Sequence, residues 1–432
     1  MSSLSPDFDV IVVGAGPGGF AAAVAAARGG ARTLLIERYG FAGGLATAGL
    51  VNPFMSYTLP DGGARLTGPV FNELIDRMYA LGAMNEGKNI FDDERMKFVL
   101  DDMLREAGVT VLFHSLFAGV EVDGGVVRTV HTHGKSGRQS FQGRIVIDGT
   151  GDGDVAAAAG SRVEMGREED GRCQPMTLCF RMAGVDPSWS DTSGGLWSGN
   201  KGLRGMLTEI LDRAKADRRV DQPREDVLLF HTLDPSVIHF NTTRVVGRSA
   251  TSTLDMTAAE FEARRQVREL SELFRAECEF FKNAYVSKMA AQIGVRESRR
   301  AIGEVVLTED DVLGARKFDD AVARCNYSID IHNPAGGGTV IKRIPKGDYY
   351  EIPYHCLLPE GPENLVMACR AIGATHEAHS SLRIMPTVAT FGEAAGRAAA
   401  RAVRDKTSLR EVDGAALKAE MYPASAEQPA GG

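Results

Sequence analysis

The stretch that decides the fold is DVIVVGAGPGGFAAAVAAARGGARTLLIE, residues 9–37. The apolar run Asp9–Val13 is typical of a buried parallel strand. A glycine-rich turn follows, then an alanine-rich helix from about Phe20 to Arg28 and a second strand, Thr33–Ile36. We therefore expect a βαβ unit at the start of the chain, and with it a parallel α/β sheet.

The turn after the first strand has the spacing GxGxxG. Gly14 permits a tight turn, Gly16 lets the backbone approach a pyrophosphate, and Gly19 allows close packing of helix on strand. The pyrophosphate would lie at the helix N-terminus, where free N–H groups favour an anion. Glu37 ends the second strand, where it could bind a ribose diol and disfavour the 2′-phosphate of NADP. These features predict a dinucleotide site without separating FAD from NAD.

Composition and charge narrow the function classes. The 432 residues suffice for two or three packed units. Lys+Arg number 49 and Asp+Glu 57, so the formal net charge of -8 argues against nucleic acid as a partner. The six cysteines include no CxxC, so no metal or iron–sulfur site is expected. Glycine is the excess residue, 49 in all, which is about 11% against about 7% in average proteins.

The N-terminus and the apolar segments predict where in the cell the protein is found. The first nine residues, MSSLSPDFD, lack the basic region of a signal peptide. The longest apolar stretch, residues 10–27, is interrupted by glycine and proline and does not predict a transmembrane helix. We expect a cytoplasmic protein that does not bind a membrane.

Further elements follow the first unit. We expect helices over 71–81 and 93–107, strands over 109–113 and 144–147, and a hairpin over 117–130. Residues 176–182 and 237–243 alternate apolar and polar side chains, which predicts an antiparallel sheet with one polar face. A long helix is expected over 257–288, with Thr257 and Glu260 as a capping box. The chain then returns to a strand over 364–368 and a helix over 386–404, and its last dozen residues are expected to be disordered.

Two further segments favour FAD over NAD. Asp148-Gly-Thr-Gly151 follows a strand and resembles the ATG element of disulfide reductases and related flavoproteins, where the strand passes close to the cofactor. The predicted helix from Pro386 is rich in small residues, so it can pack tightly against the first βαβ unit. Its N-terminus could stabilise negative charge on a reduced flavin.

On these motifs, the chain from Asp9 to about Val403 resembles the FAD-dependent oxidoreductases of the glutathione-reductase-like superfamily. It most resembles a bacterial family described only as FAD-dependent oxidoreductase. The segments that carry the resemblance are Gly14–Gly19 with Glu37-Arg38, Phe41–Thr47, Asp148–Asp154, Ile293–Arg300, Leu307–Leu313 and Ala371–Ala378.

The resemblance implies a Rossmann-like FAD-binding domain with a parallel central sheet and an α+β substrate domain with an antiparallel sheet. Residues 1–160 and 346–408 would form the FAD-binding domain, 161–345 the substrate or cap domain, and 409–432 a partly disordered tail. No histidine follows the Gly43-Gly44 turn directly, so FAD is expected to be non-covalent. The cofactor-binding residues implied are Gly14, Gly16, Pro17, Gly18, Gly19, Glu37, Arg38, Gly43, Gly44, Leu45, Ala46, Thr47, Asp148, Gly149, Thr150, Gly151, Arg370, Met385, Pro386 and Thr387.

Missing motifs discriminate among relatives. The chain has no second GxGxxG with an acid for NAD(P)H, no CxxxxC dithiol, and no Gly-Asp-Ala-x-His element of aromatic hydroxylases. We therefore expect a dehydrogenase or oxidase that transfers a hydride between a small organic substrate and flavin N5. The alternatives are a flavin monooxygenase that uses NAD(P)H and oxygen, and a flavin-binding electron carrier or scaffold. Oxygen or a redox partner would accept the electrons, and a homodimer is possible.

Three residues are the candidates for catalysis. His376, with His379 nearby, could serve as a general base, or it bonds only to loop backbone. Arg296, with Arg299 and Arg300, could hold a carboxylate or phosphate of the substrate, or these arginines pair with Glu297 and Glu304. Asn241 and its neighbour His239 are candidate substrate contacts on the polar face of a strand, or that face is exposed. Tyr350 and Tyr354 either line the pocket or only pack.

Overall fold

The βαβ unit consists of β1 (Asp7–Val13), α1 (Pro17–Arg28) and β2 (Thr33–Ile36) in the computed structural model, which describes residues 7–60, 63–191, 195 and 202–423. Strands β1 and β2 pair in parallel, as the sequence predicts. Helix α1 begins earlier than expected, at Pro17, because proline needs no partner for an N–H in the first turn.

The central sheet has the order β3-β2-β1-β6-β5-β4, with β17 beside β6. Strands β1, β2, β3, β17 and the second half of β6 are parallel, whereas β4, β5 and the first half of β6 are antiparallel. Strand β6 is longer than the predicted strand over 144–147 because its polar first half pairs with β5. The bounds are β3 (Thr110–Leu112), β4 (Ser115–Asp123), β5 (Val126–Gly134), β6 (Gly137–Asp148) and β17 (Leu365–Met367).

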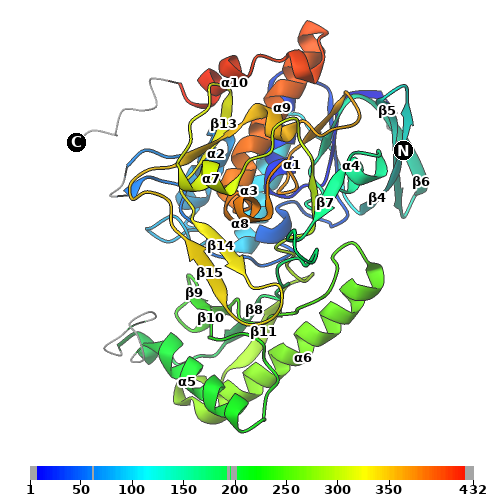
Figure 1. Ribbon diagram of the computed structural model, residues 1–432. Helices are drawn as coiled ribbons and strands as arrows, with labels where there is room; N and C mark the ends of the chain where they lie inside the picture. Colours follow the sequence, from blue (N-terminus) through cyan, green and yellow to red (C-terminus); the bar gives the residue numbers. More distant parts are fainter. Residues whose placement is uncertain (1–6, 61–62, 192–194, 196–201, 424–432) are drawn as a thin grey trace.

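Helix α9 (Met385–Asp405) packs along α1 in the larger of two bodies (Figure 1). Gly392 faces the backbone of Gly18, and Gly396 faces that of Ala22. A Cβ atom at either glycine would overlap the facing carbonyl oxygen, so the two helices can lie this close only without side chains there. The predicted small-residue helix is confirmed. Around this pair lie α2 (Pro69–Ala80), α3 (Asp93–Glu106) and α10 (Gly414–Met421).

A second sheet of order β11-β8-β10-β9 is antiparallel and has its own hydrophobic core. Met176, Leu178, Phe180 and Met182 are buried in that core, which confirms the predicted apolar face. We call this sheet and its two helices the cap; in Figure 1 the helices lie on the side of the sheet away from the larger body. The elements are β8 (Phe180–Ala183), β9 (Leu229–His231), β10 (Val237–Phe240), β11 (Tyr285–Met289), α5 (Leu203–Ala216) and α6 (Thr253–Glu277).

Short pairs of strands and small helices connect the two bodies. The hairpin of β14 and β15 extends from the larger body toward the cap (Figure 1). Its neighbours include α8, which precedes α9 in the chain. The bounds are α4 (Asp154–Ala158), β7 (Val163–Met165), β12 (Arg299–Ala301), α7 (Glu309–Leu313), β13 (Ala321–Cys325), β14 (Ile329–His332), β15 (Thr339–Lys342), β16 (Tyr350–Pro353) and α8 (His376–Leu382).

Two local predictions are wrong. Helix α6 is capped by Ser252, whose hydroxyl accepts a hydrogen bond from the N–H of Asp255 at 3.3 Å, and the predicted cap Thr257 lies inside the helix. The helix ends at Glu277 rather than near 288, because the following residues enter β11.

Strand β10 ends at Phe240, so Asn241 and Thr243 lie beyond it. The disorder expected at the chain end falls largely on residues 424–432, which lie outside the described residues.

No helix in the described ranges is both long and apolar enough to span a membrane.

The contact between α1 and α9 predicts that valine destabilises the protein at the contact but not on the exposed face of α9. We expect Gly396→Val to lower the free energy of unfolding by about 3 kcal/mol, because the new side chain would displace α1. Arg404→Val, on an exposed face of the same helix, should change it by less than about 1 kcal/mol. Urea unfolding followed by circular dichroism measures both, and equal effects would contradict the packing assignment.

Candidate functional site

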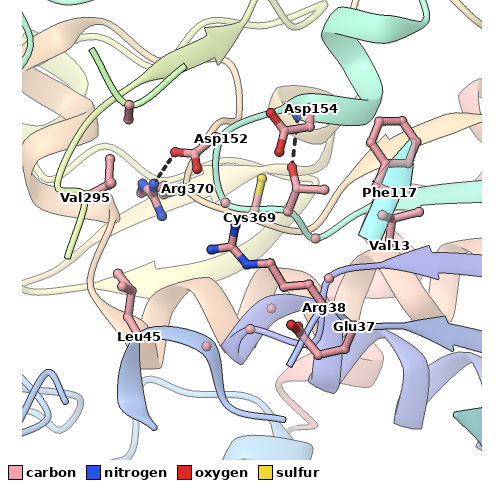
Figure 2. Close-up of a pocket in the computed structure, with 18 of the residues that line it drawn as sticks. Val13, Glu37, Arg38, Leu45, Phe117, Asp152, Asp154, Val295, Cys369 and Arg370 are labelled. Carbon is pink, nitrogen blue, oxygen red and sulfur yellow. Dashed lines mark hydrogen bonds and ion pairs between the residues drawn. The ribbon is translucent and has the colours of Figure 1, made fainter. Parts of the chain in front are cut away.

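A cavity of about 870 Å³ lies at the carboxyl ends of β1, β2 and β6. Ligands bind at this edge of parallel α/β sheets. Phe117 lies on one side of the cavity, and Leu45 and Val295 lie on the other (Figure 2). We call the part lined by Leu45, Val295 and Met385 the flavin end, because the resemblance places the reactive edge of the flavin beside Leu45.

The glycine turn forms the floor of the cavity. Gly14 has φ 91°, and a Cβ there would lie 2.5 Å from the carbonyl oxygen of Gly149. Gly16 differs, because its φ of -64° is open to any residue and its Cβ would meet no protein atom closer than 3.9 Å. Gly16 lines the cavity, so the space that its missing side chain leaves is space for a ligand.

The N-terminus of α1 lies at the same place. Gly16 is its N-cap and offers no side-chain cap, and the first turn contains no acidic residue. Pro17 and Gly18 line the cavity beside it. Uncapped N–H groups and the helix dipole favour an anion such as a pyrophosphate here.

Glu37 is fixed at the end of β2 by two backbone groups. The N–H of Ala15 donates to its Oε2 at 2.8 Å, and the N–H of Tyr39 donates to its Oε1 at 2.9 Å. Each carboxylate oxygen keeps capacity for another donor, such as a ribose hydroxyl. The next residue, Arg38, extends into the cavity (Figure 2) and donates a hydrogen bond to Gln292.

Asp148 organises the second turn from behind the cavity wall. Its carboxylate accepts hydrogen bonds from the N–H and hydroxyl of Thr150, at 3.0 and 2.7 Å, and from the N–H of Ala156 at 3.0 Å. The side chain is completely buried, and this burial raises the pKa of Asp148 to about 6. It therefore shapes the turn, while Gly149, Thr150 and Gly151 line the cavity.

An ion-pair cluster closes the wall above this turn. Arg370 pairs with Asp152 at 2.5 Å, and Ser298 donates to the same carboxylate at 2.5 Å. Arg299 pairs with Asp154 at 2.8 Å. Figure 2 shows Arg370 and Asp152 facing one another at the cavity. The Nε of Arg370 is buried and has no hydrogen-bond partner in the described structure.

The structure brings thirteen of the twenty predicted cofactor residues to the cavity wall. The other seven stand behind it: Gly19, Gly43, Ala46, Thr47, Asp148, Pro386 and Thr387. Those that line it are Gly14, Gly16, Pro17, Gly18, Glu37, Arg38, Gly44, Leu45, Gly149, Thr150, Gly151, Arg370 and Met385.

Known proteins identify the cofactor. The sequence profile of the family described as FAD dependent oxidoreductase matches residues 9–421. The chain belongs to this family. FAD is its cofactor, and the uncapped α1 terminus, the empty space at Gly16 and the fixed acid Glu37 fit the pyrophosphate and ribose of FAD. No curated protein matches the chain.

Solved structures share the fold of this FAD-dependent oxidoreductase. A p-nitrophenol 4-monooxygenase from Pseudomonas putida is 12% identical, with a TM-score of 0.50 over 98% of this chain and 92% of that one. A geranylgeranyl bacteriochlorophyll reductase-like protein from Thermoplasma acidophilum is 15% identical, with a TM-score of 0.45 over 93% and 79%. A myxobacterial chondrochloren halogenase is 13% identical, with a TM-score of 0.46 over 96% and 78%. The fold shared with the p-nitrophenol 4-monooxygenase, together with the two kinds of sheet, confirms the predicted fold class.

Several parts of the wall were missed from the sequence. They come from β4, from the start of α6, from the segment after β11 and from the loop before α9: residues 115–119, Ala250, Thr251, Thr253, Met256, Gln292, Ile293 and Arg383. Two of them carried a signal: Ile293 begins one of the segments of the resemblance, and Arg383 stands three residues before the helix predicted to face the flavin. The others are brought to the site by packing of distant elements.

His376 lies behind the flavin end in a buried cluster. Its Nδ1 lies 2.8 Å from Oε1 of Glu297, which also accepts a hydrogen bond from Arg300 at 2.6 Å. The second oxygen of Glu297 accepts from the N–H of Gln174 at 3.0 Å. Glu297 therefore fixes the ring and leaves Nε2 of His376 without a hydrogen bond in the described part of the chain. His379 is fully buried, and burial holds its pKa well below the usual range.

The polar face of the cap sheet is buried rather than exposed. His239 is 1% exposed, and burial, followed by the charge of Arg181, lowers its pKa to about 3. Asn241 accepts a hydrogen bond from Arg296 at 3.4 Å. Of the predicted arginine group, Arg299 and Arg300 are ion-paired, and Arg296 is not among the ion pairs of the described residues.

The two tyrosines considered for the pocket lie in the core instead. Tyr350 and Tyr354 are fully buried and bond to Ser381 and to the carbonyl of Leu409, at 2.7 and 2.9 Å. They pack and do not line the cavity. Within the described ranges no group of three His, Cys, Asp or Glu side chains could hold a metal, and all six cysteines are free.

The two kinds of glycine in the turn predict opposite phenotypes. We expect Gly16→Val to weaken FAD binding at least about 100-fold while the apoprotein keeps its stability, because the new side chain occupies only ligand space. Gly19→Ala should destabilise the apoprotein, because its Cβ would overlap the carbonyl of Gly14. Fluorescence titration of apoprotein with FAD and urea unfolding measure the pair. Full FAD affinity in Gly16→Val would contradict the pyrophosphate assignment.

Proposed function

We propose that this enzyme is a dehydrogenase or oxidase that transfers a hydride between a small organic substrate and FAD. The observation that carries the proposal is the buried pair of His376 and Glu297, whose Nδ1 and Oε1 lie 2.8 Å apart. Glu297 lies between Val295 and Arg299, both of which line the cavity. Within the flavoproteins, the motifs favour the glutathione-reductase-like superfamily.

The residues of this cluster suit the transfer of a proton. When bound, FAD supplies the hydride acceptor, and a substrate that loses a hydride from carbon must also lose a proton from oxygen or nitrogen. A histidine whose Nδ1–H donates to a carboxylate presents Nε2 as the base. Arg300 balances the charge of Glu297, so the carboxylate orients the ring of His376 rather than taking its proton.

A flavin monooxygenase is the second candidate. The fold shared with the p-nitrophenol monooxygenase over nearly the whole chain supports it, since this fold also accommodates oxygen insertion. A flavin-binding electron carrier is a third possibility of another class. For the principal candidate we propose non-covalent FAD, a cytoplasmic location, a homodimer, and oxygen or a redox protein as the electron acceptor.

Anaerobic reduction of the bound flavin separates these activities. We expect substrates from a panel of alcohols, amines and sugars and their acid derivatives to bleach the absorbance near about 450 nm without NAD(P)H. Bleaching that requires NAD(P)H, with oxygen incorporated into product, would instead identify a monooxygenase. Reduction by a partner protein alone would identify an electron carrier.

His376 provides a sharper test. We expect His376→Ala to slow substrate-driven flavin reduction about 100-fold at neutral pH with unchanged FAD content, because a general base is lost. His355→Ala is the matched control, since His355 also pairs with a carboxylate, Asp320 at 2.8 Å, but no residue within two positions of either partner lines the cavity. Stopped-flow absorbance measures both rates, and an unchanged rate in His376→Ala would remove His376 from the mechanism.

A further inference from the structure

Arg296 and Arg383 contact only neutral acceptors among the described residues. Arg296 donates to the carbonyl of Pro175 at 2.6 Å, and to the side-chain oxygens of Thr177 and Asn241 at 3.3 and 3.4 Å. Arg383 donates to side-chain and backbone oxygens of Gln174, Ser380 and Asp330, at 3.3, 3.1 and 3.2 Å. Neither guanidinium has a carboxylate partner within the described ranges, although each residue is half-buried.

Three arginines near the flavin end are ion-paired. Arg299, Arg300 and Arg370 pair with Asp154, Glu297 and Asp152, at 2.8, 2.6 and 2.5 Å. Burying an arginine without an acidic partner is costly, so interior arginines are normally paired. Arg296 and Arg383 therefore differ from these three neighbours, whereas Arg38, which bonds to the neutral Gln292, follows β2 and belongs to the part of the wall beside Glu37.

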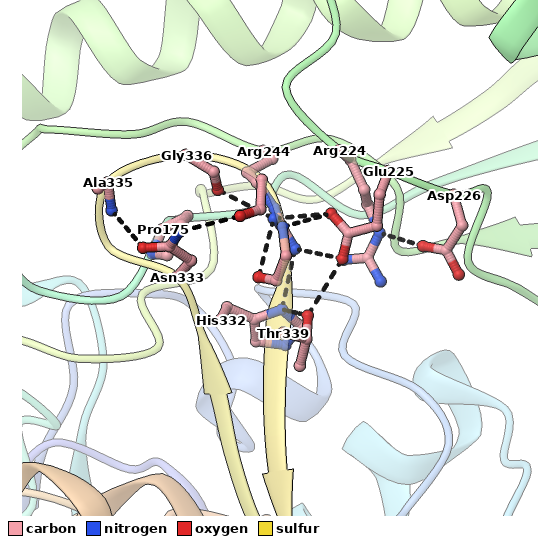
Figure 3. A network of polar contacts seen from close by, with 12 residues as sticks. Pro175, Arg224, Glu225, Asp226, Arg244, His332, Asn333, Ala335, Gly336 and Thr339 are labelled. Atoms are coloured by element: carbon pink, nitrogen blue, oxygen red, sulfur yellow. Dashed lines mark hydrogen bonds and ion pairs between the residues drawn. The ribbon is translucent and has the colours of Figure 1, made fainter.

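Two more arginines lie beside them, and these are neutralised. Arg244 pairs with Glu225 at 2.9 Å, and Arg224 pairs with Asp226 at 3.1 Å. Figure 3 shows this network, in which Arg244 also bonds to His332 on β14 at 3.1 Å. Burial and the surrounding arginines hold the pKa of His332 far below its usual range, so this ring adds no charge.

The charges of this region do not balance. Its remaining acid, Asp330, accepts a hydrogen bond from the hydroxyl of Tyr327 at 2.7 Å. Asp226 also pairs with Arg204, so five arginines face the three carboxylates of Glu225, Asp226 and Asp330, which leaves the region with an excess of positive charge. Burial, followed by the charges of Arg383, Arg224 and Arg244, lowers the pKa of Arg296 to about 9, so it remains charged at neutral pH.

An unpartnered donor accompanies the excess charge. Gln174 is 2% exposed, and its Oε1 accepts from both Arg383 and the N–H of His332. Its Nε2 has no partner in the described structure. A buried amide donor without an acceptor costs free energy unless a ligand supplies one. An anion bound here would therefore supply both a negative charge for the two arginines and an acceptor for the amide of Gln174.

Arg383 connects this site to the cofactor cavity. Arg383 lines the cavity two residues before Met385, and Arg296 directly follows the lining residue Val295. We propose that the substrate is a carboxylic acid whose carboxylate is held by Arg296 and Arg383, with its reacting carbon at the flavin end. This inference rests on the proposed hydride transfer. The planar guanidinium fork matches the two oxygens of a carboxylate.

The carboxylate positions the substrate and takes no part in the reaction. In an alcohol or amine that also bears a carboxylate, a C–H bond breaks and its electron pair leaves as hydride to FAD. The O–H or N–H proton passes to His376, and a C=O or C=N bond forms. Atoms and electrons balance with FAD as the only oxidant.

Binding to the FAD-loaded protein tests the site without turnover. The probes are lactate against lactamide, benzoate against benzamide, and phenyl phosphate, each titrated while the flavin spectrum is followed. We expect at least one carboxylate to bind ten-fold or more tightly than its amide, because only the charged member pairs with the guanidiniums. Equal affinity, tighter binding of phenyl phosphate, or no carboxylate binding at millimolar concentration would overturn the proposal.

Variants locate the binding. Arg296→Gln and Arg383→Gln should each weaken the carboxylate at least ten-fold, with amide affinity and FAD content unchanged. Arg296→Lys and Arg383→Lys keep the charge if the glutamine variants do not fold, and they should retain part of the affinity. Arg404→Gln, on the exposed end of α9, is the control. Unchanged carboxylate affinity in both Arg296 and Arg383 variants would overturn the assignment.

The two proposals fail separately. If carboxylates bind through Arg296 and Arg383 but none reduces the flavin anaerobically, the anion site stands and hydride transfer fails. If neutral alcohols reduce the flavin and carboxylates neither bind nor react, hydride transfer stands and the anion site fails.

Discussion

The rest of this structure depends on backbone segments that cross so closely that no Cβ atom fits between them. A Cβ on Gly149 would lie 2.7 Å from the carbonyl oxygen of Gly14, and one on Gly18 would overlap the carbonyl of Ala368. The turns after β1, β6 and β17 therefore meet at the start of α1, and α9 reaches the same point through Gly392. Because these segments lie so close together, one helix N-terminus, one fixed acid and the ends of three strands form a single binding surface.

Glycine has two different roles at this crossing. At Gly14 and Gly19 the protein itself fills the space that a side chain would need, so glycine is required for folding. At Gly16 the backbone is ordinary and the space beside it is part of the cavity, so glycine is required for the ligand. The glycine excess in the composition reflects both roles, and only the three-dimensional surroundings of each glycine separate them.

The sequence could predict whatever is determined by neighbours along the chain. The first βαβ unit, the glycine turn and α9 were predicted well, because strand, turn and helix signals are contiguous there. The start of α6 was not, because Ser252 and Thr257 are both plausible caps and packing decides between them. The same reason explains the missed wall residues of β4 and α6, which reach the cavity only through the arrangement of the sheet and the cap.

The interior between the larger body and the cap is organised by charge. The polar face of the cap sheet looked like an exposed surface in the sequence, yet His239 is buried and Arg296 is enclosed. Ion pairs such as Arg300 with Glu297 offset much of the desolvation cost of this polar interior. Arg296 receives no such compensation, so the free protein retains a desolvation cost that an anionic occupant would remove. That cost makes the affinity of the site for an anion larger than hydrogen bonds alone would give, since binding relieves a penalty already present in the fold.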